Sequence, residues 1–233
     1  MTSPEKVVGV IGGMGPEATV EFLRRLVAAT PAEDDADHLH VIVDNNPKVP
    51  SRIKALIEGN GTDPTPALVG MARKLEGAGA DFLVVPCNTA HHYLPAIRKA
   101  IRIPVLDVVD LAIAKLRALE PKPSRIGVLA SPAVRLIGLF ASRLSATGYK
   151  VMFPNEEDEA KLFAIIKSLK AGRVGDTHQR SYDAIARRLS EDGADAMLVA
   201  CTELSLLSAP QNCGPLFDTL DLLVEATIRT ARG

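Results

Sequence analysis

Two cysteines in this sequence, Cys87 and Cys201, end nearly identical phrases that lie 114 positions apart. One phrase starts at Gly79 and the other at Gly193, and each reads Gly-Ala-Asp, then apolar residues, then the cysteine. A lone cysteine at the end of a strand is more often a small buried hydrophobic residue, but the duplication favours a chemical role. Cys213 has no such counterpart and is interpreted as an incidental loop thiol.

Matched thiols suit a reaction that inverts a carbon centre. Such a reaction needs a base on one face of the carbon, an acid on the other, and stabilisation of the carbanion between them. We expect a helix to begin just after each cysteine, at Asn88 and at Thr202. Free backbone NH groups at those helix starts would favour thiolate over thiol.

The segments that must position these cysteines alternate between short β-branched runs and stretches of helical length. This rhythm predicts an α/β fold with parallel sheets flanked by helices, because parallel strands are covered on both faces and read as continuous apolar runs. Parallel sheets bind ligands beyond the carboxyl ends of their strands, where both cysteines fall. The predicted strands are residues 7–11, 40–44, 82–85, 104–109, 125–130, 150–153, 196–200 and 215–219.

The internal repeat predicts two pseudo-symmetric lobes that face each other across one cleft. We place the first lobe at residues 1–117 and the second at residues 118–220, with a linker in the Pro-containing segment 119–124. The last helical stretch, residues 221–233, is expected to pack back on the first lobe.

Three further segments could bind an anionic substrate. Residues 12–17 form a glycine-rich loop that could contact a carboxylate, although a turn that only lets strand and helix pack closely fits equally well. Arg52 could hold a carboxylate through two hydrogen bonds, or could be a solvated arginine that opens a helix. Lys170 ends a predicted helix, where a cation often only complements the helix dipole.

Composition excludes several classes of function. The formal net charge is -1 with Lys and Arg spread along the chain, which argues against nucleic-acid binding. No signal-peptide pattern precedes the first strand and no apolar run approaches membrane-spanning length, so we expect a cytoplasmic protein without membrane contact. His91 and His92 lack the spacing of a metal site, and no metal is expected. His91 could orient the Cys87 region, whereas His92 is expected to face outward.

Taken together, these motifs resemble the aspartate/glutamate racemase family over the whole chain, and the opening glycine loop resembles its aspartate racemase branch. The matching segments are residues 12–16 (Gly-Gly-Met-Gly-Pro), 45–47 (Asn-Asn-Pro) with Pro50 and Arg52, 86–91 (Pro-Cys-Asn-Thr-Ala-His), 170–172 (Lys-Ala-Gly) and 201–203 (Cys-Thr-Glu).

The resemblance implies two α/β lobes, a site between them, and a cofactor-independent amino-acid racemase that uses two thiols and no pyridoxal phosphate. It implies a small-molecule amino-acid or dicarboxylate substrate and a homodimer. Cys87 and Cys201 would be the catalytic acid/base pair, and Arg52 and Lys170 would bind substrate carboxylates. The other predicted substrate-binding residues are Met14, Asn45, Asn88, Thr89, Ser131 and Thr202.

The sequence departs from aspartate-specific relatives at two places. Ser51 stands where they carry an aspartate beside the arginine, and Ser131 and Val134 stand where they carry threonines. Loss of a hydrogen-bond donor at Val134 bears on recognition of a second carboxylate. Aspartate, glutamate or a related amino acid therefore stay open as substrates. Two other functions also stay open: a cysteine-dependent isomerase or decarboxylase of small dicarboxylates, and a non-catalytic carboxylate-binding protein.

Overall fold

The computed structural model describes residues 5–233, which form two compact units. One unit runs to Val108 and also contains Leu220–Gly233, and the other is Val109–Thr219. Each unit holds one parallel sheet flanked by helices, which confirms the predicted α/β fold class. The chain leaves each unit at the start of a helix, α4 (Val108–Arg117) or α9 (Thr219–Arg232).

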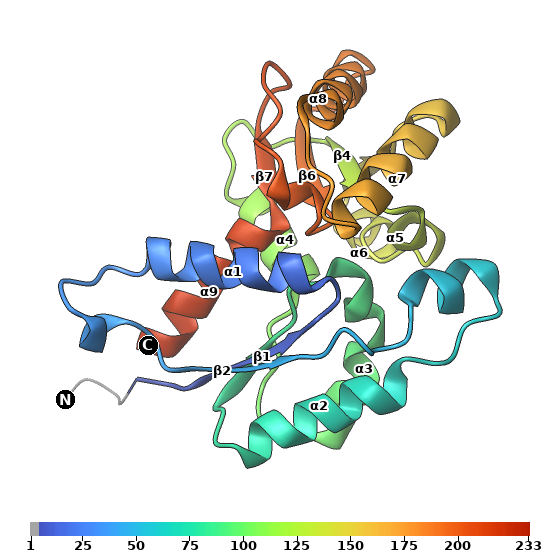
Figure 1. Ribbon diagram of the computed structural model, residues 1–233. Helices are drawn as coiled ribbons and strands as arrows, with labels where there is room; N and C mark the ends of the chain where they lie inside the picture. The colour runs from blue at the N-terminus through green and yellow to red at the C-terminus, as the bar shows by residue number, and fades with distance from the viewer. Residues whose placement is uncertain (1–4) are drawn as a thin grey trace. The chain divides into compact units, whose positions relative to one another are not determined.

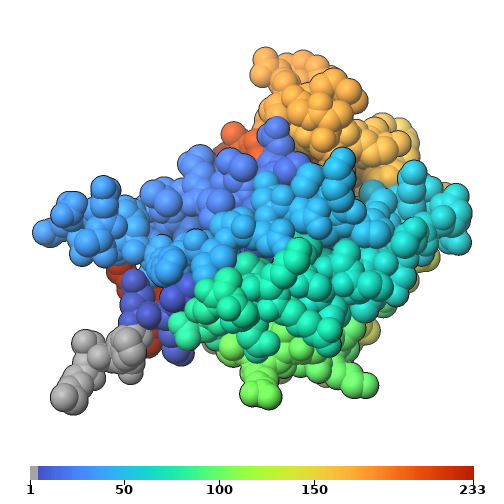
Figure 2. All heavy atoms as spheres, turned by 60° about the horizontal axis from the view of Figure 1, so that its bottom comes forward, coloured from blue at the N-terminus to red at the C-terminus, as the bar shows by residue number. Residues whose placement is uncertain are grey.

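The sheet of the first unit has the strand order β2-β1-β3, with all strands parallel. Its central strand β1 is buried along its whole length, as expected for a continuous apolar run between two helical layers. Helix α1 lies on one face of this sheet and helices α2 and α3 lie on the other (Figure 1). In the space-filling view, the side chains of α2 form a continuous layer over that face (Figure 2). The elements are β1 (Val8–Gly12), α1 (Pro16–Ala29), η1 (Asp35–Asp37), β2 (Val41–Asn45), η2 (Lys54–Glu58), α2 (Thr65–Gly77), β3 (Phe82–Val84), η3 (Asn88–Tyr93) and α3 (Leu94–Ala100).

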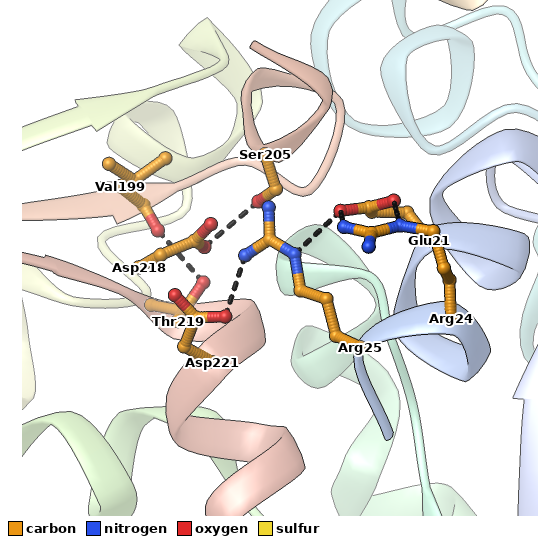
Figure 3. A network of polar contacts seen from close by, with 8 residues as sticks. All are labelled: Glu21, Arg24, Arg25, Val199, Ser205, Asp218, Thr219 and Asp221. Carbon is orange, nitrogen blue, oxygen red and sulfur yellow. Dashed lines mark hydrogen bonds and ion pairs between the residues drawn. The ribbon is translucent and has the colours of Figure 1, made fainter. Parts of the chain in front are cut away.

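The C-terminal helix α9 packs in the first unit from Leu220 onward. Arg25 on α1 forms ion pairs with Glu21 and Asp221, each with an N···O distance of 2.7 Å, and so joins α1 to α9 (Figure 3). At the other end of α9, the backbone NH of Lys6 donates to the carbonyl of Ala231 at 2.9 Å. These contacts attach both ends of α9 to the first unit.

The second unit repeats the same strand arrangement with one additional paired strand, in the order β5-β4-β6-β7, again all parallel. Helices α7 and α8 pack on each other, and α8 packs against the central strand β4. Two bonds that appear in Figure 3 hold β7 and its end: Ser205 donates to Asp218 at 2.8 Å, and Thr219 donates to the carbonyl of Val199 at 2.9 Å. The elements are β4 (Arg125–Ala130), α5 (Pro132–Leu136), α6 (Ala141–Ala146), β5 (Lys150–Met152), α7 (Glu156–Lys170), α8 (Asp176–Glu191), β6 (Ala196–Ala200), η4 (Leu204–Leu206) and β7 (Leu216–Asp218).

The repeated Gly-Ala-Asp phrase forms the same turn in both units. Gly79 and Gly193 have φ values of 98° and 102°, a left-handed conformation that favours glycine. The aspartate that follows accepts hydrogen bonds from the start of the neighbouring strand. Asp81 binds the backbone NH of Val7 at 2.7 Å, and Asp195 binds that of Arg125 at 2.8 Å. The phrase therefore fixes where each cysteine-bearing strand begins.

Seven of the eight predicted strands are present within two residues of their expected limits. The prediction for residues 104–109 is wrong: only Val105 bridges to Leu83, and helix α4 begins at Val108. Its buried side chains, which include Val108, Ala112 and Leu116, recur every four residues as on one face of a helix. The β-branched pair that opens the helix made this segment read as a strand.

The lobe boundaries predicted from the sequence, residues 1–117 and 118–220, stay a prediction. The units defined by packing divide at residue 108, whereas the sequence placed a linker at residues 119–124. Within residues 5–233, no helix is long and apolar enough to cross a membrane.

Candidate active site

Cys87 lies just beyond the carboxyl end of β3, and its side chain is 7% exposed. Its backbone is extended, and the 3₁₀ helix η3 begins at the next residue. The carbonyl of Cys87 accepts the backbone NH of Ala90 at 3.2 Å and lies 3.0 Å from Nδ1 of His91. These contacts fix the backbone that carries the thiol.

His91 is buried and holds this turn in place as a neutral ring. Because a carbonyl oxygen only accepts hydrogen bonds, the contact with Cys87 places the ring proton on Nδ1. Burial lowers the pKa of His91, while the Cys87 carbonyl and the Asp107 carboxylate act in the opposite direction. The ring therefore orients the Cys87 backbone, as the sequence suggested. His92 is exposed, also as expected.

The glycine-rich loop after β1 packs tightly against the loop after β2. Gly13 has a φ of 89°, and a Cβ atom there would lie 2.3 Å from the backbone of Asn46. The hydroxyl of Thr19 accepts the backbone NH of Gly13 at 3.0 Å. Met14 is buried in the same hydrophobic cluster as Cys87, whereas Asn45 is exposed at the end of β2. The glycines therefore allow close packing at this point, and carboxylate contact by the loop stays a prediction.

Arg52 precedes a single π-helical turn, η2, and is partly committed to its own loop. Its Nη1 donates to the carbonyl of Pro50 at 3.0 Å, and its buried Nε has no hydrogen-bond partner among the described residues. The pKa of Tyr93 is raised, first by burial and then by the Asp63 carboxylate, and the charge of Arg52 only partly offsets this. Tyr93 belongs to the same buried cluster as Cys87.

A cavity of about 460 Å³ opens in the first unit beside Tyr93. Its lining comes from η2, from the segment between η2 and α2, from the start of α2, and from the end of η3 and the start of α3, and it includes Asp63 and the exposed His92. Asp63 is held by the backbone and hydroxyl of Thr65 at 2.9 and 2.7 Å. Tyr93 therefore lines the cavity and also belongs to the buried cluster that contains Cys87.

Cys201 lies in the equivalent position, just beyond the carboxyl end of β6, and is 6% exposed. Its carbonyl accepts the backbone NH of Leu204 at 2.9 Å, which repeats the contact between Cys87 and Ala90. Its side chain differs, because Sγ donates to Oε2 of Glu203 at 3.1 Å.

Glu203 joins Cys201 to the end of helix α7. Its Oε1 lies 2.6 Å from Nζ of Lys170. The Glu203 side chain is 7% exposed and that of Lys170 is 32% exposed. Lys170 therefore does more than complement the dipole of its own helix, because its ammonium pairs with the carboxylate that accepts the thiol hydrogen.

The expected thiolate-favouring helix start is absent at Cys201. Only a turn and the three-residue helix η4 follow it, with Glu203 as the N-cap. Burial raises the pKa of Cys201 well above its usual value, and the Glu203 carboxylate raises it further, while Lys170 lowers it. The prediction that a helix end favours thiolate is wrong here, because desolvation and a neighbouring carboxylate outweigh so short a helix.

The remaining predicted site residues divide between the two units. In the first unit, Asn88 is buried directly after Cys87 and Thr89 is partly exposed. In the second unit, Ser131 follows Ala130, the residue that pairs with Ala200 across β4 and β6. The buried residues Ser131 and Thr202 therefore lie at the same sheet edge as Cys201.

Sequence reasoning missed the roles of Glu203 and Tyr93. Glu203 was noted only as part of a family motif, yet it contacts the thiol of Cys201. Its position two residues after the cysteine was the available signal, because a turn brings side chains so spaced close together. Tyr93 left no comparable signal, since its place at the cavity depends on the folding of η2 and η3.

The fold and these two cysteine-bearing sheet edges define an α/β enzyme with internally repeated architecture. The chain belongs to the Asp/Glu/Hydantoin racemase family, whose model matches residues 11–227, so the predicted family and the isomerase class are confirmed. It is 27% identical to the broad specificity amino-acid racemase RacX of Bacillus subtilis, over 96% of this chain and 97% of that protein.

Solved structures give the same result. The aspartate racemase of Picrophilus torridus is 28% identical, with a TM-score of 0.85 over 97% of this chain and 94% of that one. An aspartate racemase homologue from Pyrococcus horikoshii shares the fold at 20% identity, with a TM-score of 0.76 over 98% of this chain and 100% of that chain.

Proposed function

We propose that this protein is a cofactor-independent amino-acid racemase in which Cys87 and Cys201 remove and return the α-proton. The observation that carries the proposal is the duplication: each unit presents one cysteine beyond the carboxyl end of the strand that pairs with its first strand, β3 with β1 and β6 with β4, and the same backbone turn follows each cysteine. A pure binding protein has no use for two such thiols.

In the proposed reaction, the thiolate of one cysteine takes the α-hydrogen as a proton, and the C–H bond electrons stay on the carbon. The thiol of the other cysteine then donates its proton to the opposite face of that carbon. The product is the mirror-image amino acid, and the two cysteines have exchanged protonation states. Exchange of the thiol protons with water restores the starting states, so no external oxidant, reductant or cofactor is consumed.

We propose aspartate, glutamate or a related amino acid as substrate, with Arg52 and Lys170 as the carboxylate anchors. The names of the relatives support an amino acid in general, because one is an aspartate racemase and another is a broad specificity amino-acid racemase. The buried, unpartnered Nε of Arg52 is available for a substrate oxygen. The other proposed contacts are Met14, Asn45, Asn88, Thr89, Ser131 and Thr202.

A homodimer and a cytoplasmic location belong to the same proposal. Both rest on the sequence and on its family resemblance. Sedimentation of the purified protein at micromolar concentration measures the first, and fractionation of the cells that make it measures the second.

Solvent-exchange NMR tests the proposed reaction. The protein is incubated in D₂O with L-aspartate, L-glutamate and a panel of neutral L-amino acids, and the loss of each α-proton signal is followed. We expect α-deuterium and the D-enantiomer to accumulate together with at least one substrate. A folded protein that exchanges no α-proton in the whole panel contradicts the racemase proposal, and turnover of maleate-like dicarboxylates instead would favour an isomerase.

A further inference from the structure

We infer that Glu203 is a positioning residue that keeps Cys201 in its thiol form, and that Lys170 holds the Glu203 carboxylate in place. This inference rests on the proposed function, because it assigns Cys201 the role of the acid in the resting enzyme. It concerns the second unit alone, in which all three residues lie.

The geometry of the contact sets the direction of the hydrogen bond. The Sγ–Oε2 distance is 3.1 Å, and an ionised carboxylate can only accept, so the hydrogen belongs to the thiol. A thiolate at this position would face the carboxylate at the same distance as a second negative charge. In a buried setting, that arrangement is strongly unfavourable.

Lys170 makes the arrangement stable and fixed. Both carboxylate oxygens of Glu203 are engaged, one by the thiol and one by the ammonium at 2.6 Å. A buried carboxylate with no cation beside it costs free energy, and the ammonium of Lys170 supplies that partner. The ion pair also places the other carboxylate oxygen where the thiol can reach it.

The other titratable groups around Cys201 do not replace this effect. Tyr182 on α8 belongs to the same buried cluster as Cys201 and Cys213 and is itself held neutral, since burial raises its pKa well above the usual value. The charges of Asp218 on β7 and of the two thiolates would raise this pKa further. Lys170 on α7 is the cation that acts on Cys201, and its ammonium reaches the site through Glu203.

The functional consequence is an enzyme with unequal thiols. Cys201 starts as the proton donor, and it can act as a base only after it has given up its proton in turnover. When Cys201 is the thiolate, the carboxylate of Glu203 repels it and favours return of a proton. Glu203 thus resets the second unit after each reaction without contacting the substrate.

Titration of ¹³Cβ-labelled cysteines by NMR tests this inference without any substrate, so its failure is distinct from failure of the racemase proposal. We compare wild type with Glu203→Gln and Lys170→Met. Glu203→Gln removes the negative charge, and we expect the Cys201 midpoint to fall by about one pH unit or more. Lys170→Met removes the cation, and we expect the midpoint to rise.

The matched control is Glu157→Gln. It removes the carboxylate of an exposed ion pair, Glu157 with Lys161, whose two residues both lie on α7. We expect it to leave the Cys201 midpoint unchanged. The inference is overturned by an unchanged midpoint in folded Glu203→Gln, by shifts of the same sign in the Glu203 and Lys170 variants, or by an equal shift in the control. Should Glu203→Gln not fold, an unchanged or lowered midpoint in Lys170→Met overturns it by itself.

Discussion

The surroundings of Cys87 and Cys201 share a backbone and differ in their side chains. In both units the cysteine follows the parallel strand that pairs with the first strand of that unit, and its carbonyl accepts the NH of the residue three positions later. Around Cys87, the ring of His91 fixes the backbone. Around Cys201, Glu203 contacts the sulfur itself. The repeat therefore preserved the position of the thiol, while the carboxylate that contacts Cys201 comes from a residue outside the repeated phrase.

The largest expected effect comes from removing either thiol. Cys87→Ala and Cys201→Ala should each lower the turnover number by about 10²–10⁴-fold, because each removes a general acid/base. Chiral chromatography of the product measures the loss. Cys213→Ala is the matched control and should retain wild-type turnover within about twofold, since its sulfur only donates to a loop carbonyl. If one of the two site variants keeps full turnover, the symmetric two-thiol scheme fails.

Removal of the anchor in the first unit should affect binding more than turnover. Arg52→Met should raise the KM by about 10- to 100-fold, the range expected for loss of a charge-assisted hydrogen bond. Arg52→Lys should recover part of that loss, because it keeps the charge without the fork geometry. In contrast, Lys170→Met should also move the pH profile of turnover, because Lys170 pairs with Glu203. Initial rates over a range of pH separate the two anchors, and identical behaviour of both variants would contradict the unequal environments.

The central strands provide a comparison of packing. Gly9 and Gly127 occupy equivalent positions, and a Cβ at either would lie within 3.0 Å of neighbouring side chains. At Gly9 one of these atoms is the rigid Cβ of Ala80, whereas at Gly127 they belong to flexible side chains. Each substitution should lower the free energy of unfolding by about 1–3 kcal/mol, and Gly9→Ala should lower it more than Gly127→Ala.

Urea denaturation of both variants measures this difference. The control is Gly70→Ala in helix α2, where an added Cβ meets nothing within 4 Å. That substitution should stabilise the protein by about 0.5–1 kcal/mol, because alanine favours a helix over glycine. Equal losses in the free energy of unfolding for Gly9→Ala and Gly127→Ala would contradict the expected difference between the two strands.

The smallest effect concerns alkaline stability in the second unit. Burial raises the pKa of Tyr182 well above its usual value, followed by the effects of Asp218 and Cys201. The stability contributed by a raised pKa is fully present below the unfolded value, about 10 for tyrosine, and is lost as pH rises toward the folded value. Tyr182→Phe removes the titrating group and should flatten the decrease in Tm above about pH 10. A decrease as steep as that of wild type would contradict this account.

Much of the fold could be predicted from the sequence because parallel strands carry their own signal. The apolar run of β1 and the identical limits of β4 and β6 follow from burial on both faces. The segment 104–109 was misread because β-branched residues suit both a strand and a buried helix start. The local sequence pattern fits both alternatives. Only the residues that pack around Val108 in the folded protein decide between them.

The candidate site was predictable in part for a similar reason. A repeated phrase located both cysteines, and glycines located the loop that carries Met14. The ionisation of Cys201 was not predictable in this way. A helix start favours thiolate, whereas burial and a carboxylate favour thiol, and the balance depends on distances that span α7 and η4.

The sequence by itself determined the α/β class, the repeat and the two strand-end cysteines, because each depends on residues that are neighbours in the chain. Only the tertiary structure decided that Lys170 pairs with Glu203 and that Glu203 contacts Cys201. Electrostatic energy depends on separation in space and on the exclusion of water. Lys170 and Glu203 lie more than thirty positions apart, and only folding brings their charges to 2.6 Å in a buried setting.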